Sequence, residues 1–182
     1  MPESAALAIR PVTPADVPVL LRLVRDLAAY EQLEHEVTAT VDDYQRALFA
    51  GDASARVAHA ALAELDHQPI GYMVWFRSFS TFKARSKLYL EDLYVAPEYR
   101  GRGFGTAMLG HLAALCHAEG LARMQWQVLD WNAPSIAFYR SLGADVSSHW
   151  WDCSLAGDAL AALAARATQD ASRVTHPPGD GT

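Results

Sequence analysis

The sequence predicts an α/β fold in which helices flank a mixed central β-sheet within a single domain, residues 1–167. Two observations predict it. Strand-like runs alternate with segments whose apolar residues recur at helical spacing. The chain has 182 residues, 51% of them hydrophobic, which is enough for one domain with a substantial core. No internal repeat or linker divides it.

The first half of the chain contains two predicted helices and four predicted strands, the first strand over 6–10. Thr13 has the side chain of a helix N-cap and Pro14 suits the first helical position, so a helix is expected from here. Apolar residues at helical spacing continue it to Ala28. The remaining elements are a short helix over 40–48, strands over 57–65, 69–76 and 87–95, and a polar loop over 78–86.

The second half continues with a helix over 106–119. Its residues Met108, Leu112 and Cys116 share one apolar face, and Gly120 suits the position after a helix end. Beyond it we expect a strand over 123–129, a helix over 132–142, a last strand over 145–155 and an alanine-rich helix over 159–167. The tail, 168–182, is polar and is expected to be disordered.

Composition and charge exclude several classes of function. The net charge of −6 argues against nucleic acid as a partner. No apolar run is long enough to span a bilayer and residues 1–4 lack signal-peptide character, so we expect a cytoplasmic protein with no membrane partner. Cys116 and Cys153 are expected to be buried free thiols, and their spacing offers no metal site.

A glycine-rich stretch directly follows the predicted strand over 87–95 and precedes a helix, which is the arrangement of a phosphate-binding loop. A Walker-A loop is excluded because the chain has no Gly-Lys pair. The dinucleotide pattern G-x-G-x-x-G also fails, because Thr106 stands at its third position when the count starts at Gly101. What remains is Arg-x-x-Gly-x-Gly, at Arg100, Gly103 and Gly105. The alternative interpretation of this motif, taken alone, is an ordinary glycine-containing turn before a core helix.

A second motif lies over residues 131–144, which read WNAPSIAFYRSLGA. It fits the pattern N-x-x-[SA]-x-x-x-Y-x-x-x-G-[AF]. Together with the preceding loop it resembles the GNAT superfamily of N-acetyltransferases, whose fold the chain is therefore expected to share. Within that superfamily the chain looks like the spermidine/spermine (diamine) N-acetyltransferase group, closer to its thialysine N-ε-acetyltransferase-like members. Further residues that carry this resemblance are Ile9-Arg10-Pro11, Leu27, Ala28, Tyr30, Glu31, Leu90-Glu91-Asp92 and Tyr99-Arg100-Gly101.

The resemblance implies direct transfer of an acetyl group from acetyl-CoA, the cosubstrate, to a primary amine, without a metal. A lysine-like amine has a pKa of about 10.4 and must lose a proton, and the departing thiolate must gain one. The position in the motif makes Tyr139 the general acid, although a helix tyrosine also suits core packing. Glu91 is the candidate base, acting through water. Glu91 and Asp92 also suit a salt bridge or a solvated strand end.

The resemblance also implies which residues bind the donor. The backbone N–H groups of Leu93 and Val95 are expected to bind the pantetheine arm and polarise the thioester carbonyl. The glycine-rich loop is expected to hold the pyrophosphate, and the second motif is expected to contact the arm. The predicted cofactor-binding residues are Leu93, Tyr94, Val95, Arg100, Gly101, Arg102, Gly103, Phe104, Gly105, Thr106, Asn132 and Ser135.

The predicted acceptor-binding residues are Tyr30, Glu31, Lys83, Arg85, Glu91 and Asp92. Lys83 and Arg85 lie where polyamine-specific members carry acidic residues. They suit the carboxylate of a lysine-like amino acid, and equally a solvated surface loop. Residues 147–151 also lack the glutamate pair of the polyamine enzymes. Both departures favour a small amino acid or diamine as acceptor.

Three other functions stay open at this point. They are a polyamine acetyltransferase, a protein or peptide N-acetyltransferase, and a non-catalytic acyl-CoA-binding sensor on the same fold. The presence of both Tyr139 and Glu91 argues against the sensor. Members of the group are usually homodimers, so a homodimer is expected.

Overall fold

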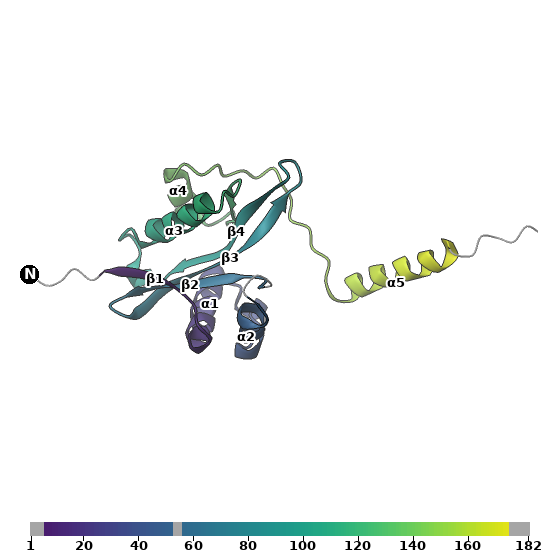
Figure 1. Cartoon of the computed structure of the whole chain (residues 1–182), viewed down its shortest axis with the longest axis horizontal. Coiled ribbons are helices and arrows are strands. Elements are labelled where there is room, and N and C mark those ends of the chain that lie inside the picture. Colours follow the sequence, from purple (N-terminus) through teal and green to yellow (C-terminus); the bar gives the residue numbers. More distant parts are fainter. Residues whose placement is uncertain (1–5, 53–55, 175–182) are drawn as a thin grey trace, which may run out of the picture. The chain divides into compact units, whose positions relative to one another are not determined.

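Figure 1 shows the computed structural model, which describes residues 6–52 and 56–174. The chain divides into two compact units, Met1–Gln127 and Val128–Thr182. The first contains the β-sheet. The second contains helices α4, Ala133–Ser141, and α5, Gly157–Val174. No described helix combines the length and apolar character needed to cross a membrane.

A five-stranded sheet forms the centre of the first unit, with strand order β1-β2-β3-β4-β5. Neighbouring strands are antiparallel from β1 to β4, whereas β5 runs parallel to β4. This arrangement confirms the predicted α/β class with a mixed sheet. The strands are β1, Leu7–Pro11; β2, His59–Leu65; β3, Gln68–Ser80; β4, Arg85–Val95; and β5, Met124–Gln125.

Helices cover both faces of this sheet (Figure 1). On one face lie α1, Val17–Glu31, and α2, Val41–Phe49; on the other lies α3, Phe104–Ala118. The short helix predicted over 40–48 forms as α2, and the Thr40 side chain caps it by accepting from the Asp43 N–H. The core beneath α1 and α2 joins apolar helix residues to two tyrosines of the sheet, and includes Leu20, Leu23, Leu48, Leu62, Tyr72 and Tyr94.

A β-bulge interrupts the pairing of β3 with β4 at Glu91. Val74 is opposite Asp92 and Trp75 is opposite Leu90, so Glu91 is the extra residue. In a regular strand Asp92 would share the face of Leu90. The bulge instead places Asp92 on the face of Val74, beneath α1 and α2.

Several predicted elements differ from the structure. The polar loop expected over 78–86 is mostly strand, because β3 and β4 extend into a long hairpin. The strand expected over 123–129 forms only as β5. The helix expected over 159–167 runs over Gly157–Val174 as α5, so 168–174, predicted as tail, are helical. Residues 175–182 of that tail lie outside the described residues.

The last predicted strand, over 145–155, is wrong. Residues 144–156 have no regular secondary structure. Trp150 and Trp151 are 89% and 93% exposed, and because they are consecutive, one sheet face could not bury both. Within the described residues no strand pairs with this segment. Cys153 is exposed, which corrects the expectation of two buried thiols, while Cys116 is buried as predicted.

Candidate active site

The second half of β4 presents backbone N–H groups at an open edge of the sheet. The Ala96 N–H donates to the Ile70 carbonyl of β3 at 2.9 Å. Because N–H groups alternate in direction along a strand, those of Leu93 and Val95 point away from β3. On that side the described pairing with β5 ends at Tyr89. A bound molecule can therefore accept hydrogen bonds from both groups.

The glycine-rich loop connects this edge to the start of α3. Gly101 and Gly103 have φ angles of 73° and 83°, a left-handed conformation that favours glycine. Gly103 precedes the first helical residue, and its carbonyl accepts from the Ala107 N–H at 3.0 Å. The N–H groups of residues 104–106 consequently have no partner within the helix. These groups, with the positive end of the helix dipole, suit a phosphate group.

Two arginines bring positive charge to this loop. The Arg100 Nε donates to the Val95 carbonyl at 2.8 Å. Its guanidinium carbon also lies 4.5 Å from the ring centroid of Tyr30 and 5.7 Å from that of Tyr94. The guanidinium carbon of Arg102 lies 4.9 and 5.8 Å from the centroids of two aromatic rings of the loop. Arg100 thus connects a predicted acceptor residue, Tyr30, to the strand predicted to bind the donor.

A cluster of acids and phenols lies beside the open edge. Glu91 is exposed on the bulge, and Asp92 is half-buried next to it. The Tyr72 hydroxyl donates to Oδ2 of Asp92 at 3.1 Å. Glu31, at the end of α1, and Tyr44, on α2, interact electrostatically with this pair. Three predicted acceptor-binding carboxyls are therefore gathered here.

Burial dominates the electrostatics of this cluster. It raises the pKa of Asp92 to about 6, against a lowering by the Tyr72 hydrogen bond, and the Glu91 and Glu31 charges raise it further. Burial also raises the pKa values of Glu31, Tyr44 and Tyr72. Within the described residues, no three His, Cys, Asp or Glu side chains are placed to hold a metal ion. The cluster suits an organic cation, or a proton drawn from one.

The two tyrosines of this cluster are absent from the sequence prediction. Tyr72 belongs to an apolar strand and Tyr44 to a short amphipathic helix, and both sequence contexts indicate core packing. Only the register of β3 against β4, together with the bulge, brings the Tyr72 hydroxyl to Asp92. No short stretch of the sequence indicates how β3 and β4 are paired.

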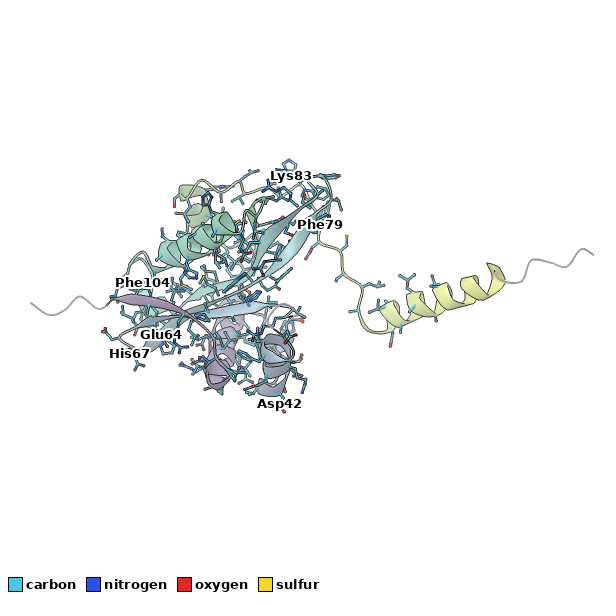
Figure 2. All side chains as sticks on the ribbon, in the orientation of Figure 1. Asp42, Glu64, His67, Phe79, Lys83 and Phe104 are labelled. Atoms are coloured by element: carbon cyan, nitrogen blue, oxygen red, sulfur yellow. The ribbon has the colours of Figure 1, made fainter. Side chains whose placement is uncertain are left out.

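The two predicted carboxylate-binding cations lie away from this cluster. Arg85 donates to the Gly120 carbonyl at 2.6 Å, just beyond the end of α3. The 15 residues of α3 make that helix about 22 Å long, at about 1.5 Å per residue. Along β4, Arg85 is six residues from Glu91, or about 20 Å. Figure 2 shows Lys83 at the hairpin end, far from Phe104 at the start of α3. A lysine-length molecule cannot span these distances.

The second motif forms α4 in the second unit. Asn132 is the N-cap residue, and its side-chain oxygen accepts from the Ser135 N–H at 3.2 Å. Tyr139 is 8% exposed, and its ring centroid is 5.3 Å from that of Phe138. The predicted helix is thus confirmed, with Tyr139 held in a defined position on it.

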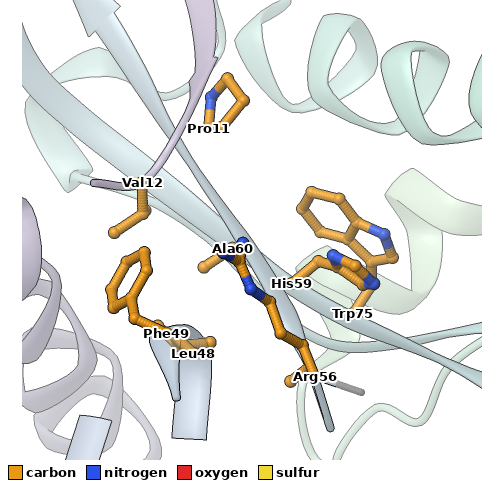
Figure 3. A pocket seen from close by; sticks show the side chains of 9 residues that line it. Pro11, Val12, Leu48, Phe49, Arg56, His59, Ala60 and Trp75 are labelled. Atoms are coloured by element: carbon orange, nitrogen blue, oxygen red, sulfur yellow. The ribbon is translucent and has the colours of Figure 1, made fainter. Parts of the chain in front are cut away.

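A pocket also lies where α2 ends and β2 begins (Figure 3). The His59 and Trp75 rings stack there at 5.7 Å, and Arg56 supplies a cation. None of the pocket's nine described lining residues is acidic. A cationic amine is therefore expected at the Asp92 cluster and not in this pocket.

A mixed sheet with β4 N–H groups at an open edge, followed by a glycine-rich loop and a helix start suited to phosphate, is the arrangement expected of a coenzyme A-dependent acyltransferase. Residues 22–144 match the model of the Acetyltransferase (GNAT) family, and the chain belongs to that family. It is accordingly an N-acetyltransferase, and members of the family use acetyl-CoA as cosubstrate.

Curated relatives support the same assignment. The chain is 34% identical to thialysine N-ε-acetyltransferase of Bos taurus, over 89% of this chain and 99% of the relative. It is 28% identical to L-ornithine N5-acetyltransferase of Arabidopsis thaliana, over 85% and 86%. It is also 31% identical to a spermidine/spermine N(1)-acetyltransferase-like protein of Homo sapiens, over 77% of this chain and 21% of that protein.

Solved structures share the fold at low sequence identity. An integron cassette protein from the mobile metagenome of V. cholerae has a TM-score of 0.70 and 22% identity, covering 87% of this chain and 97% of its own. An aminoglycoside acetyltransferase from a soil metagenomic sample, in complex with sisomicin, has a TM-score of 0.68 and 16% identity, covering 82% and 97%. These likenesses establish the fold alone.

Proposed function

We propose that this enzyme acetylates a primary amine of a small molecule that carries a second cationic group, either a lysine-like amino acid such as thialysine or a diamine. The observation that carries the proposal is the gathering of Glu31, Glu91 and Asp92 beside the open edge of β4. Carboxylates attract and orient a cationic acceptor. The thialysine and ornithine relatives are named for substrates of this kind.

The donor would lie along β4 and the glycine-rich loop. The N–H groups of Leu93 and Val95 would bind the pantetheine arm and polarise the thioester carbonyl. The N–H groups at the start of α3 would receive the pyrophosphate. Asn132 and Ser135 would contact the arm from α4. Binding of the donor in this position would offset much of the entropy that is lost when acceptor and thioester are brought together.

In the proposed mechanism Glu91, acting through water, takes a proton from the acceptor ammonium. The amine nitrogen then attacks the thioester carbon, and the carbon–sulfur bond breaks. Tyr139 donates its phenolic proton to the departing sulfur and regains one from the nitrogen, which becomes the amide. Proton transfers of this kind typically contribute a rate factor of about 10² or more.

The carboxylate clamp predicted from Lys83 and Arg85 is not part of this proposal. Arg85 is held by the Gly120 carbonyl, and the acceptor cluster contains acids in place of cations. The same acids favour a second candidate, acetylation of a polyamine, which the spermidine/spermine-like relative also supports. The two candidates differ in the length of the preferred acceptor.

A panel of amines tests the function. The enzyme is incubated with acetyl-CoA and thialysine, L-lysine, L-ornithine, cadaverine, pentylamine or spermidine, and released thiol is measured. We expect turnover with at least one small dicationic acceptor and much slower turnover with pentylamine, which matches cadaverine in length but lacks its second charge. Equal rates for those two amines would contradict the acidic acceptor site. Acetyl-CoA binding without thiol release from any amine would indicate the sensor.

Tyr139→Phe tests the proposed acid. We expect kcat to fall about 10²-fold with unchanged acetyl-CoA affinity, because only the proton donor is removed. Tyr89→Phe is the matched control, since it removes a phenol from a ring packed 5.0 Å from Phe76, and it should keep wild-type turnover. Unchanged turnover in Tyr139→Phe would remove Tyr139 from the mechanism.

A homodimer and a cytoplasmic location stay predictions. Trp150 and Trp151 are 89% and 93% exposed, and paired exposed tryptophans are typical of an interaction surface. Light scattering on the purified full chain distinguishes a dimer from a monomer.

A further inference from the structure

Tyr72 holds one oxygen of Asp92 from inside the core. Its side chain is fully buried, and its hydroxyl donates to Oδ2 of Asp92 at 3.1 Å. Its ring lies 6.1 Å from that of Tyr94, the residue opposite it on β4. The bulge at Glu91 turns Asp92 to this face, so the hydrogen bond exists because the strand is irregular. The second carboxyl oxygen of Asp92, Oδ1, takes no part in this hydrogen bond.

In the described part of the chain, the titratable groups that interact with Asp92 are carboxyls and phenols, and none carries positive charge. They come from four elements: Glu31 from α1, Tyr44 from α2, Tyr72 from β3 and the adjacent Glu91 on β4. Among the described residues, neither arginine nor lysine forms an ion pair with Asp92. A half-buried carboxylate without a counter-ion is costly. An incoming ammonium group, or a proton taken from one, would supply the missing positive charge.

We propose that the proton leaving the acceptor through Glu91 comes to rest on Oδ1 of Asp92, and that Tyr72 is the positioning residue that fixes Asp92 to receive it. This inference rests on the proposed function. One N–H bond of the ammonium breaks, and its proton passes through water and Glu91 to Asp92, which later releases it to solvent. A carboxyl that titrates near the working pH is better suited to this step than an ordinary one.

The test is the pH dependence of kcat/KM with acetyl-CoA and thialysine. In the wild type we expect the rate to fall on the acid side as Asp92 becomes protonated. Tyr72→Phe removes the hydrogen bond that favours the carboxylate, so this acid limb should move to higher pH by about 0.5 to 1 unit. Tyr44→Phe is the matched control, because it removes a nearby phenol without removing that hydrogen bond, and should leave the limb in place.

Two further variants separate the roles of the carboxyls. Asp92→Asn should abolish the acid limb. Glu91→Gln should lower kcat about tenfold or more but keep the limb, moved toward lower pH, because the Glu91 charge that raises the Asp92 pKa is removed. A limb that is unmoved in Tyr72→Phe, or that disappears in Glu91→Gln and persists in Asp92→Asn, would overturn the inference.

Carbon NMR of labelled aspartate in the full chain measures the Asp92 titration independently of turnover. The Asp92 pKa should rise in Tyr72→Phe, and an unchanged value would count against the positioning role. Failure of the proposed function looks different, because the wild type would then release no thiol with any amine at any pH. That outcome would also remove the proton-transfer role of Asp92.

Discussion

Replacing Asp92 by asparagine should stabilise the protein at neutral and alkaline pH. The pKa of this carboxyl rises from 3.8 to about 6 on folding, chiefly through burial. At about 1.36 kcal/mol per tenfold change in proton affinity, an ionised Asp92 costs the folded state about 3 kcal/mol. Asparagine keeps the shape and an oxygen that accepts from Tyr72, but it must also be desolvated. The expected gain is therefore about 1.5 to 3 kcal/mol.

The sign of the pH dependence follows from the same shift. The folded protein binds the Asp92 proton more tightly than the unfolded chain does, so the cost is absent below about pH 4 and complete above about pH 6 to 7. Urea unfolding of the wild type and Asp92→Asn, at about pH 8 and about pH 4, measures the difference. Glu91→Gln is the control, because Glu91 is exposed and should change little. A variant no more stable than the wild type at about pH 8, or equally stabilised at both pH values, would refute the reasoning.

Three further substitutions test other parts of the fold. Gly71→Ala should destabilise by about 2 kcal/mol or more, because its Cβ would lie 2.3 Å from a carbonyl oxygen of β4; a wild-type Tm would contradict this. Arg10→Ala leaves Glu64, which is 7% exposed, without its 2.7 Å ion pair. It should lower the free energy of unfolding in urea by about 2 kcal/mol. A loss under about 0.5 kcal/mol would contradict this expectation. Gly103→Ala strains a φ of 83° at the start of α3, whereas Gly120→Ala strains one of 62° beyond its end. Only Gly103→Ala should weaken acetyl-CoA binding in calorimetry, and equal effects of the two would contradict the placement of the pyrophosphate.

The sequence was sufficient to predict the glycine-rich loop and the elements around it. Gly101 and Gly103 adopt the left-handed conformations for which glycine is suited. The helix expected from Thr106 begins at Phe104, within the usual uncertainty of helix ends. These features were predictable because each depends on neighbouring residues: a strand, a turn that needs glycine, and an apolar face at helical spacing.

Features that depend on pairing between distant segments were not predictable. The Tyr72–Asp92 hydrogen bond joins residues 20 positions apart and requires both the register of two strands and the bulge between them. The strand expected over 145–155 failed for a related reason. Alternating apolar residues indicate a strand, but they do not supply the partner that its backbone groups need. Arg85 illustrates the same limit, because its bond to the Gly120 carbonyl depends on where α3 ends.

The bulge on β4 changes the orientation of every residue that follows it in the strand. One added residue reverses both the face taken by each later side chain and the edge taken by each later N–H group. Tyr94 is thereby buried in the core, while the amides on either side of it turn to the open edge. Deleting Glu91 would therefore remove more than one carboxylate, because core packing and the proposed donor-binding edge of β4 would change together. Engineering of either property must keep the length of this strand constant.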